Sequence, residues 1–410
     1  MTSSPLRAAC LALSVACLPA VPAMAAGSLY ADMAGIAGGS AAPSRSGQID
    51  LDALSWGASR SVRIEGGRRV IEGLSVQDIA WSQALDASTD DLFSRATTGA
   101  QLRSARFEWV DARSTGQTPS LVLEAGASVV TSLSLGGSGG GIGVNGTLNA
   151  SHLSLTYDPR PTGGPGTVTD VTYDARPGVS TGSVTRAPLQ PIGVAPARAG
   201  LYLRLGTGNS VIAGDNPSLG HENWIAIDGF SMGASGAGAP GRPLAVQDMS
   251  WTQRLDATSP VVLANLMAGE AIGQATLERV AIDATGRPVT VLQQALNDAM
   301  FTSFSLGIDP NGDASVNTTM AFTSYTQTNW VLLNDGRRIG PLSVGYDVLS
   351  GQRMTAALAS DVVGFGLGRL DGTEVFNPAP IPEPQTWALL LAGLAGVLVL
   401  ARRQGASRRA

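Results

Sequence analysis

The stretch that decides the fold is VQDIAWSQALDA at residues 76–87, because it recurs as VQDMSWTQRLDA at residues 246–257. From these stretches onward the chain aligns with itself without a gap, so that Gly99 matches Gly269, Glu108 matches Glu278 and Val110 matches Val280. Self-similarity at a fixed offset indicates repeated units of structure. The sequence therefore predicts two copies of one domain.

The match extends outward from these stretches with small gaps. Residues 55–59 (SWGAS) correspond to residues 231–235 (SMGAS), and a Leu-Tyr pair at residue 29 recurs at residue 201. We therefore predict copy one over residues 28–178 and copy two over residues 200–355. Residues 179–199, rich in Pro, Ser, Thr and Gly, are expected to form a linker, and residues 356–381 to link copy two to the membrane.

Apolar and polar residues alternate along much of each copy, as they do in half-buried strands. In copy one we expect strands over residues 48–56, 74–85, 103–110, 120–123, 128–135, 153–157 and 168–173. One helix interrupts them, from a cap at Ser88 or Thr89 to Gly99, and in copy two from Thr258 and Pro260 to Gly269. The fold class is therefore mainly β, with a small β-barrel and one helix in each copy.

The order of short segments in copy two carries a resemblance to a known family. LYLRL at residues 201–205, His221-Glu222, IAI at residues 225–227 and FSMGAS at residues 230–235 precede the repeated stretch and the Thr258-Ser259-Pro260 helix start. This order resembles Hcp, the tube protein of type VI secretion systems. Copy one is similar at residues 54–57, 136–141 and 155–159.

The resemblance implies two tandem Hcp-like β-barrels, each with one α-helix, and no catalytic residue. It also implies assembly into hexameric rings that stack into a tube. With two copies in each chain, three chains would form a pseudo-sixfold ring, since heterologous contacts commonly close. Reuse of the fold as a surface or matrix subunit is the function that we expect.

The first residues have the three zones of a secretory signal peptide: a short basic start, an apolar stretch and small residues at Ala23 and Ala25. We predict that residues 1–25 are removed by cleavage after Ala25. A lipoprotein signal ending at Cys17 is the alternative, with Ser14 as an unfavourable residue. Cys10 and Cys17 both lie in this segment, so the mature chain has no disulfide.

The other end has three parts in order: Pro382-Glu383-Pro384, an apolar run over residues 387–401, and a cluster that begins with Arg402 and Arg403. Residues 382–410 resemble the PEP-CTERM sorting signal of Gram-negative bacteria that make exopolysaccharide. The resemblance implies processing by an exosortase. We expect residues 387–401 to form a transmembrane helix, although the run is shorter than the ~20 residues usual for a span. A plain membrane anchor is the alternative.

The charge of the chain limits the classes of partner. The formal net charge is −5 and every basic residue is an arginine, several of them in the terminal cluster. An acidic exported body disfavours nucleic acid or anionic lipid as its main partner. The basic end is expected to stay in the cytoplasm, which leaves the body periplasmic after export through Sec, or extracellular after processing.

Few residues suggest chemistry, and we expect neither enzyme activity, a cofactor nor a metal site. Ser138 lies in a G-x-S-x-G pattern, but a glycine-rich loop follows it where a hydrolase needs a helix. His152 and His221 lie at different places in the two copies, and we expect His221 in a surface loop. The sequence from Asp309 to Asp313 resembles the start of a calcium loop, but a Pro-Asn-Gly turn explains it.

Several charged and aromatic residues occur in both copies. The repeated pairs Asp78/Asp248 and Asp86/Asp256 could be paired carboxylates, but we expect structural roles, with Asp86 and Asp256 capping the helix or contacting a neighbouring subunit. Trp81 and Trp251 lie either in the core or at a contact between subunits, with the core favoured.

The function that we predict is that of a non-enzymatic, exported envelope protein that forms Hcp-like homo-oligomeric rings and is sorted by an exosortase. The alternative is a monomeric surface module that binds exopolysaccharide or another envelope protein.

Overall fold

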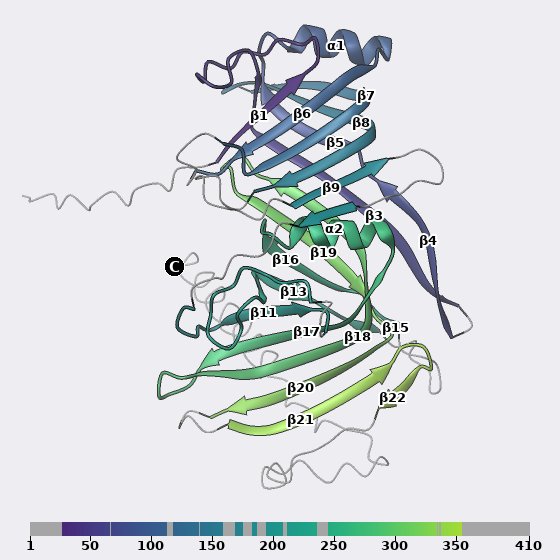
Figure 1. Cartoon of the computed structure of the whole chain (residues 1–410), viewed down its shortest axis with the longest axis vertical. Coiled ribbons are helices and arrows are strands. Elements are labelled where there is room, and N and C mark those ends of the chain that lie inside the picture. The colour runs from purple at the N-terminus through teal and green to yellow at the C-terminus, as the bar shows by residue number, and fades with distance from the viewer. Residues whose placement is uncertain are drawn as a thin grey trace, which may run out of the picture. The chain divides into compact units, whose positions relative to one another are not determined.

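The computed structural model describes residues 27–354, except for residues 66, 113–117, 139, 159–168, 175–182, 187–193, 208–210, 236–244, 334 and 336–337. The described residues belong to a single compact unit that ends at Leu358 (Figure 1). Within them, neither helix is long and apolar enough to span a membrane. Several predictions fall outside the described residues: the signal peptide with Ala23 and Ala25, the apolar segment 387–401, and the sorting residues Pro382, Glu383, Pro384, Arg402 and Arg403.

The described part of copy one contains ten strands and one helix. In chain order they are β1 (Ser28–Met33), β2 (Ile49–Leu51), β3 (Ala53–Glu65), β4 (Arg68–Val76), β5 (Ile79–Ala84), α1 (Thr89–Thr98), β6 (Leu102–Val110), β7 (Leu121–Ser138), β8 (Gly141–Tyr157), β9 (Thr169–Asp174) and β10 (Ser183–Arg186). The last of these, β10, pairs with β9 and lies inside the segment that we expected to be a linker.

Copy two repeats this order with shorter pieces in its first half. Its elements are β11 (Gly200–Leu205), β12 (Ile225–Ile227), β13 (Gly229–Ser231), β14 (Ala234–Ser235), β15 (Ala245–Val246), β16 (Met249–Arg254), α2 (Ser259–Ala268), β17 (Ala271–Ile282), β18 (Pro288–Ile308), β19 (Ala314–Ala321), β20 (Ser324–Leu332), β21 (Arg338–Asp347) and β22 (Gln352–Met354).

Both predicted helices are present and end where expected. Gly99 and Gly269 each adopt a left-handed conformation, with φ of 64° and 69°, directly after α1 and α2. Glycine takes this conformation without the steric cost of a Cβ atom, which is why it ends helices. Ser88 and Thr258 are the residues before the helices, but their side chains do not cap the helix backbone.

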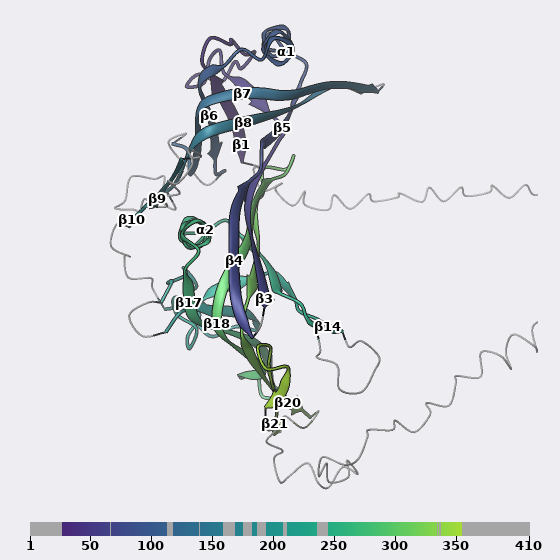
Figure 2. The same cartoon turned by 90° about the vertical axis from the view of Figure 1, so that its right-hand side faces the viewer.

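Several predicted strand boundaries are wrong. The strand expected over residues 48–56 is interrupted at Asp52, between β2 and β3, and β3 continues to Glu65. The strand expected over residues 74–85 breaks at Gln77 and Asp78, because the Asp78 carboxylate turns away to accept hydrogen bonds from Thr131 Oγ1 (2.6 Å) and Asn149 Nδ2 (2.7 Å). The two strands expected over residues 120–135 are one strand, β7, which absorbs a positive φ of 48° at Ala127 and a bulge near Thr131. The glycines after residue 135 extend β7 and β8 into a long hairpin instead of a loop (Figure 2).

The prediction of two separate closed barrels is also wrong. All but two of the strands in the described residues join one 20-stranded sheet, which runs from copy one into copy two. The copies meet where β3 pairs antiparallel with β18, in a register that places Leu54 opposite Ile308 and Ser59 opposite Ser303. Because β3 already pairs with β4 and β5 on its other edge, its remaining edge bonds to copy two instead of closing a barrel within copy one.

The junction makes a continuous run of eight antiparallel strands. The order of these strands is β7, β8, β5, β3, β18, β19, β16 and β13, with four strands from each copy. In this order β7 of copy one corresponds to β18 of copy two, and β3 corresponds to β13. The run therefore begins and ends with the counterparts of the two strands that join the copies in its middle.

Trp81 and Trp251 lie in the core, as we favoured. They are 3% and 2% exposed and contact Phe107 and Phe301, with ring centroids 6.2 Å apart in both copies. The core cluster is continuous through both copies, so the two copies fold as one unit around a shared apolar interior.

Candidate functional site

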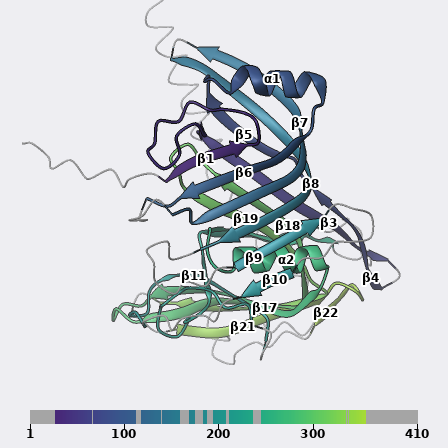
Figure 3. The same cartoon turned by 45° about the horizontal axis from the view of Figure 1, so that its top comes forward.

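The join between the copies is more than a strand pair, because copy two places a helix against copy one. Helix α2 lies against β9 and β10 of copy one and against β3 and β18 (Figure 3). Eight of its ten residues are buried, and its sequence, SPVVLANLMA, is apolar around most of its circumference. A helix of this kind requires apolar partners on more than one side.

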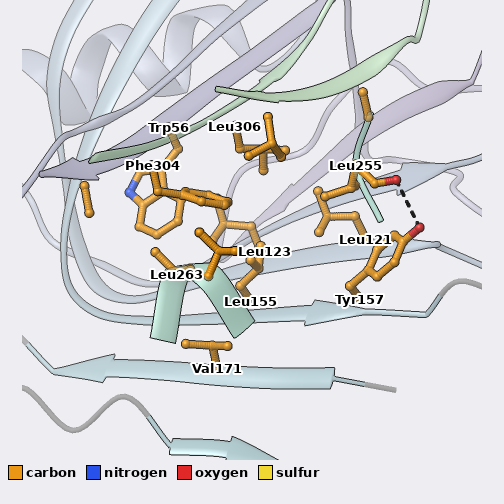
Figure 4. Close-up of a cluster of buried hydrophobic side chains, with 14 of the residues drawn as sticks. Trp56, Leu121, Leu123, Leu155, Tyr157, Val171, Leu255, Leu263, Phe304 and Leu306 are labelled. Atoms are coloured by element: carbon orange, nitrogen blue, oxygen red, sulfur yellow. Dashed lines mark hydrogen bonds between the residues drawn. The ribbon is translucent and has the colours of Figure 1, made fainter. Parts of the chain in front are cut away.

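Three leucines of copy two fill the join. Leu263 from α2 lies among Leu123, Leu155 and Val171 of copy one (Figure 4). Leu306 from β18 lies opposite Trp56, and Leu255 accepts a hydrogen bond at its carbonyl from the Tyr157 hydroxyl at 3.3 Å. Leu255, Leu263 and Leu306 are 9%, 0% and 0% exposed. We call these three residues the donor leucines.

Close backbone approach and a charged side chain complete the join. A Cβ atom on Gly57 would lie 2.6 Å from the Phe304 carbonyl oxygen, so a residue without a side chain is needed there. Arg60 of β3 donates from Nε to the Leu266 carbonyl (3.1 Å) and from Nη2 to the Met267 carbonyl (2.7 Å). These carbonyls belong to the last turn of α2, where the helix dipole favours a cation; the Leu266 carbonyl also accepts a bond from the Gly269 backbone at 3.2 Å.

Copy one carries the counterparts of the donor leucines, and all three are exposed. The repeat aligns Leu85 with Leu255 and Phe93 with Leu263. Leu135 corresponds to Leu306. In copy one, Val144 pairs with Leu135 on one side and with Gln83 on the other. In copy two, Val316 pairs in the same way with Leu306 and Gln253. Leu85, Phe93 and Leu135 are 49%, 52% and 51% exposed. Copy one therefore presents the same apolar surface with nothing in the described chain to cover it.

The strand edges follow the same pattern. Over residues 132–138, β7 pairs with β8 on one edge, and no described strand pairs with the other. In copy two, β13 pairs with β16, and its opposite edge likewise has no described partner. These are the counterparts of the two edges that join β18 to β3. Exposed strand edges pair readily with another chain.

One face of the eight-strand run is nearly free of charge. Its paired positions, apart from Arg254 at the end of β16, hold uncharged residues with mostly small or hydroxyl side chains: Ser132, Ser134, Asn145, Thr147, Ala80, Ser82, Ala53, Ser55, Ser303, Ser305, Ser315, Asn317, Ser250, Thr252 and Ser231. A shallow depression of about 450 Å³ lies across its middle, between Ser82 and Ser315, and Asp309 is among the residues that line it. Such a face offers many hydrogen bonds and carries few charges.

Of the repeated aspartates, Asp86 and Asp256 have structural roles, as expected, through a network found in both copies. Trp81 Nε1 donates to Gln83 Oε1 (2.9 Å), and Gln83 Nε2 donates to Asp86 Oδ1 (3.1 Å) and Ser88 Oγ (2.9 Å). In copy two the same bonds join Trp251, Gln253, Asp256 and Thr258. The network links a core tryptophan to the turn that starts each helix, and the glutamine at its centre is a residue whose role the sequence did not reveal.

The copies differ at the second oxygen of this aspartate. In copy one Asp86 Oδ2 accepts a hydrogen bond from the Gly39 backbone (2.9 Å). The residue of copy two that is equivalent to Gly39 is Asp215. The preceding residues, Gly38 and Gly214, make matching backbone bonds to Gly47 and Asn223. Burial raises the pKa of Asp256 to about 7, and the carboxylate of Asp215 adds to the shift.

His221 lies in a loop, but the prediction that its side chain is at the surface is wrong. The imidazole is 13% exposed, stacks on Tyr202 at 4.4 Å and lies 3.0 Å from Glu278 Oε2 through Nε2. The hydrogen bond from His221 lowers the pKa of Glu278 despite partial burial. Copy one has Arg45 in this place, 2.8 Å from Glu108 and over the ring of Tyr30. A basic side chain, histidine or arginine, between a tyrosine and a glutamate is therefore a shared structural element.

The remaining candidates for chemistry are not brought together. His152 lies on β8 and is exposed, and Ser138 ends β7 at the hairpin tip with no helix behind it. Asp309 uses its carboxylate to accept backbone bonds from Asn311 and Asp313 (both 2.9 Å), as a turn requires. Within the described residues, no group of three metal-ligating side chains is present.

Comparison with known families agrees with the duplicated architecture. The model of the family described as "Type VI secretion system effector, Hcp" matches residues 30–159 and again residues 202–330. The chain belongs to the Hcp family. It carries two Hcp copies in tandem, and residues 380–409 match the PEP-CTERM protein-sorting motif. The unpaired edges and exposed donor counterparts described above therefore lie on the first Hcp copy and on β13 of the second.

Several solved Hcp structures are similar to part of the chain. Hcp1 from Salmonella typhimurium is 18% identical, with 37% of this chain and 96% of that chain covered and a TM-score of 0.31. Secreted protein Hcp3 from Pseudomonas aeruginosa is 19% identical, with 37% and 98% covered and a TM-score of 0.29. A type VI secretion system effector from Yersinia pestis is 17% identical, with 36% and 98% covered and a TM-score of 0.27. No curated protein matches the chain.

Proposed function

We propose that this chain is a non-enzymatic structural subunit of the cell envelope, and that three chains assemble through the surfaces that join its own two Hcp copies. The observation that carries the proposal is the exposure of Leu85, Phe93 and Leu135, whose counterparts Leu255, Leu263 and Leu306 are buried at the internal join. Large apolar side chains clustered at an unpaired strand edge are typical of interaction surfaces.

The proposed contact is head to tail. The tip of β7 in one chain pairs with β13 and β14 of the next, as β18 pairs with β3 within a chain. The same relation repeated from copy to copy generates a closed ring or an open filament. The six-copy ring implied by the family corresponds to three chains and twenty-four strands, eight from each chain, with the sparsely charged face of the strands as one wall.

The ends of the chain support an exported location. The PEP-CTERM motif supports recognition by an exosortase, and residues 1–25 have the pattern of a Sec signal peptide. We propose that residues 387–401 hold the chain in the inner membrane with its body periplasmic, until processing releases it to the surface or the extracellular matrix. An antibody to the body should then find it in culture fluid only when the exosortase is present. Full retention in the membrane of a producing strain would contradict release.

A monomeric surface module that binds exopolysaccharide is a second candidate. The observation that favours it is the hydroxyl- and amide-lined face with its shallow depression, since neutral sugars are bound largely through hydrogen bonds. Assembly state separates the two candidates. The deciding measurement is the absolute mass of the exported chain in detergent, by light scattering. A mass of three chains supports the ring, whereas a single chain at every concentration overturns it and leaves the binding module.

A further inference from the structure

The surface that receives the donor leucines differs in chemistry between the copies. In copy one it consists of Leu123, Leu155 and Tyr157. Leu123 pairs with Leu155, and Tyr157 pairs with Leu121. The same strand positions in copy two are occupied by Gln294, Gln327 and Asn329, because Gln294 pairs with Gln327 and Leu292 with Asn329. We call these three residues the amide patch. In the proposed ring it is the surface that meets α1 of the next chain.

The amide patch contains a buried acceptor that lacks a donor. Gln294 is 3% exposed, and its Nε2 donates to Gln327 Oε1 at 2.9 Å. Its own Oε1 has no hydrogen-bond partner among the described residues. A buried carbonyl oxygen without a donor is unfavourable. A ligand or partner that brings a hydroxyl, an N–H group or an ordered water to this oxygen would relieve that cost.

Helix α1, on the other side of the proposed contact, is also more polar than its counterpart α2. The repeat aligns α1 with α2 residue by residue, so that Asp90 and Asp91 of α1 replace Pro260 and Val261, and Thr97 replaces Met267. Helix α1 still presents an exposed Phe93, but hydroxyl and carboxylate groups surround it. Both partners at the internal join are thus apolar. At the contact between chains, amide groups on one side face a helix on which hydroxyl and carboxylate groups flank the exposed Phe93.

We propose, on the basis of the proposed ring, that the contact between chains is a hydrated amide–hydroxyl contact and therefore reversible, whereas the join within a chain is permanent. The partner of the amide patch is α1 of a second copy of this chain. An apolar join stays buried in the folded chain, because its exposure to water would be unfavourable. The partly exposed amides of Gln327 and Asn329 can instead stay in contact with water before assembly and after dissociation, and polar contacts that retain water still bind.

The test gives copy two the residues of copy one. The variant Gln294→Leu/Gln327→Leu/Asn329→Tyr is compared with the unaltered full-length chain, purified in detergent after export, by sedimentation velocity over a series of dilutions. The unaltered chain is expected to dissociate reversibly on dilution. The dissociation midpoint of the variant is expected at a concentration at least about tenfold lower, because the variant buries apolar surface against Phe93. Thr326→Val, on the opposite face of β20, is the matched control and should leave the midpoint unchanged.

A second variant set tests whether the patch and the helix act together. Asp91→Val/Thr97→Met on α1 should tighten assembly more in the patch variant than in the unaltered chain, since an apolar helix gains most against an apolar surface. Equal effects in both backgrounds would mean that α1 does not meet the patch, and would overturn the inference.

The remaining outcomes separate this inference from the proposed ring. If the unaltered chain stays trimeric at every dilution, or if the patch variant dissociates at the same concentration, the reversible polar contact is overturned and the ring stands. If every version is a single chain at every concentration, the ring itself is overturned.

Discussion

Leu135 and Leu306 occupy the same position in two copies of one domain, yet Leu306 is completely buried opposite Trp56 and Leu135 is 51% exposed. Their strands have the same neighbours on one side, β8 and β19. The difference is that β18 has β3 on its other side, whereas the described chain has nothing beside the tip of β7. The same leucine position is thus buried at the join between copies and exposed where no described strand pairs with β7.

The first prediction compares these two leucines. Leu306→Ala should lower the free energy of unfolding by about 2–5 kcal/mol, because it leaves a cavity in the shared core. Leu135→Ala should change it by less than about 0.5 kcal/mol, because that side chain is half exposed, but it should weaken assembly. Denaturant unfolding and light scattering measure the two effects. Equal losses of stability would show that Leu135 is already buried in the isolated chain.

The second prediction concerns the register between chains. The internal pair Trp56–Leu306 implies that Met232 of one chain lies opposite Leu135 of the next. Paired residues on antiparallel strands are close enough for a disulfide, and the mature chain is expected to have no cysteine of its own. Leu135→Cys/Met232→Cys should therefore give cross-linked dimers and trimers on mild oxidation, seen on a non-reducing gel. Leu135→Cys/Leu219→Cys, with two exposed positions that the register does not pair, should stay uncross-linked.

The third prediction is a loss of stability with rising pH. Burial, with help from Asp215, raises the pKa of Asp256 from 3.8 to about 7 in the folded chain. Between these values the folded state holds a proton that the unfolded state has released. This contribution to stability is fully present below about pH 4 and is lost as the pH rises through 7, by on the order of 2–4 kcal/mol.

Replacing Asp215 by the residue of copy one tests the cause. Asp215→Gly removes the second carboxylate and should flatten part of this slope in denaturant unfolding curves measured between pH 4 and pH 8. The burial of Asp256 remains, so a smaller slope should persist. A slope that is unchanged in Asp215→Gly would mean that Asp215 does not act on Asp256.

The fourth prediction concerns the polar network beneath each helix. Gln253→Leu leaves Trp251 Nε1 without its acceptor and removes one of the donors to Asp256 Oδ1 in a buried site. The free energy of unfolding should fall by about 2–4 kcal/mol, measured with denaturant. Thr252→Val, on the same strand but the opposite face, should cost less than about 0.5 kcal/mol. Similar losses in both variants would indicate a general effect on β16.

The repeat, the two helices and their glycine ends could be predicted from sequence, because Gly99 and Gly269 act through local backbone conformation. The break at Gln77 and Asp78 could not, since it depends on Thr131 and Asn149, which are distant in sequence. The pairing of β3 with β18 was missed for the same reason. Leu85, Phe93 and Leu135 are ordinary strand and helix residues by pattern, and only the buried state of their counterparts marks them as a contact surface.

The covalent link between the copies limits the sizes that an assembly can have. Because the β3–β18 join is present in every chain, copies enter any closed assembly two at a time. Rings of five or seven copies, which single-domain subunits could form by error, are ruled out by parity. The nearest incorrect sizes are four and eight copies, and each demands a much larger change in the angle between neighbours than the loss or gain of one copy.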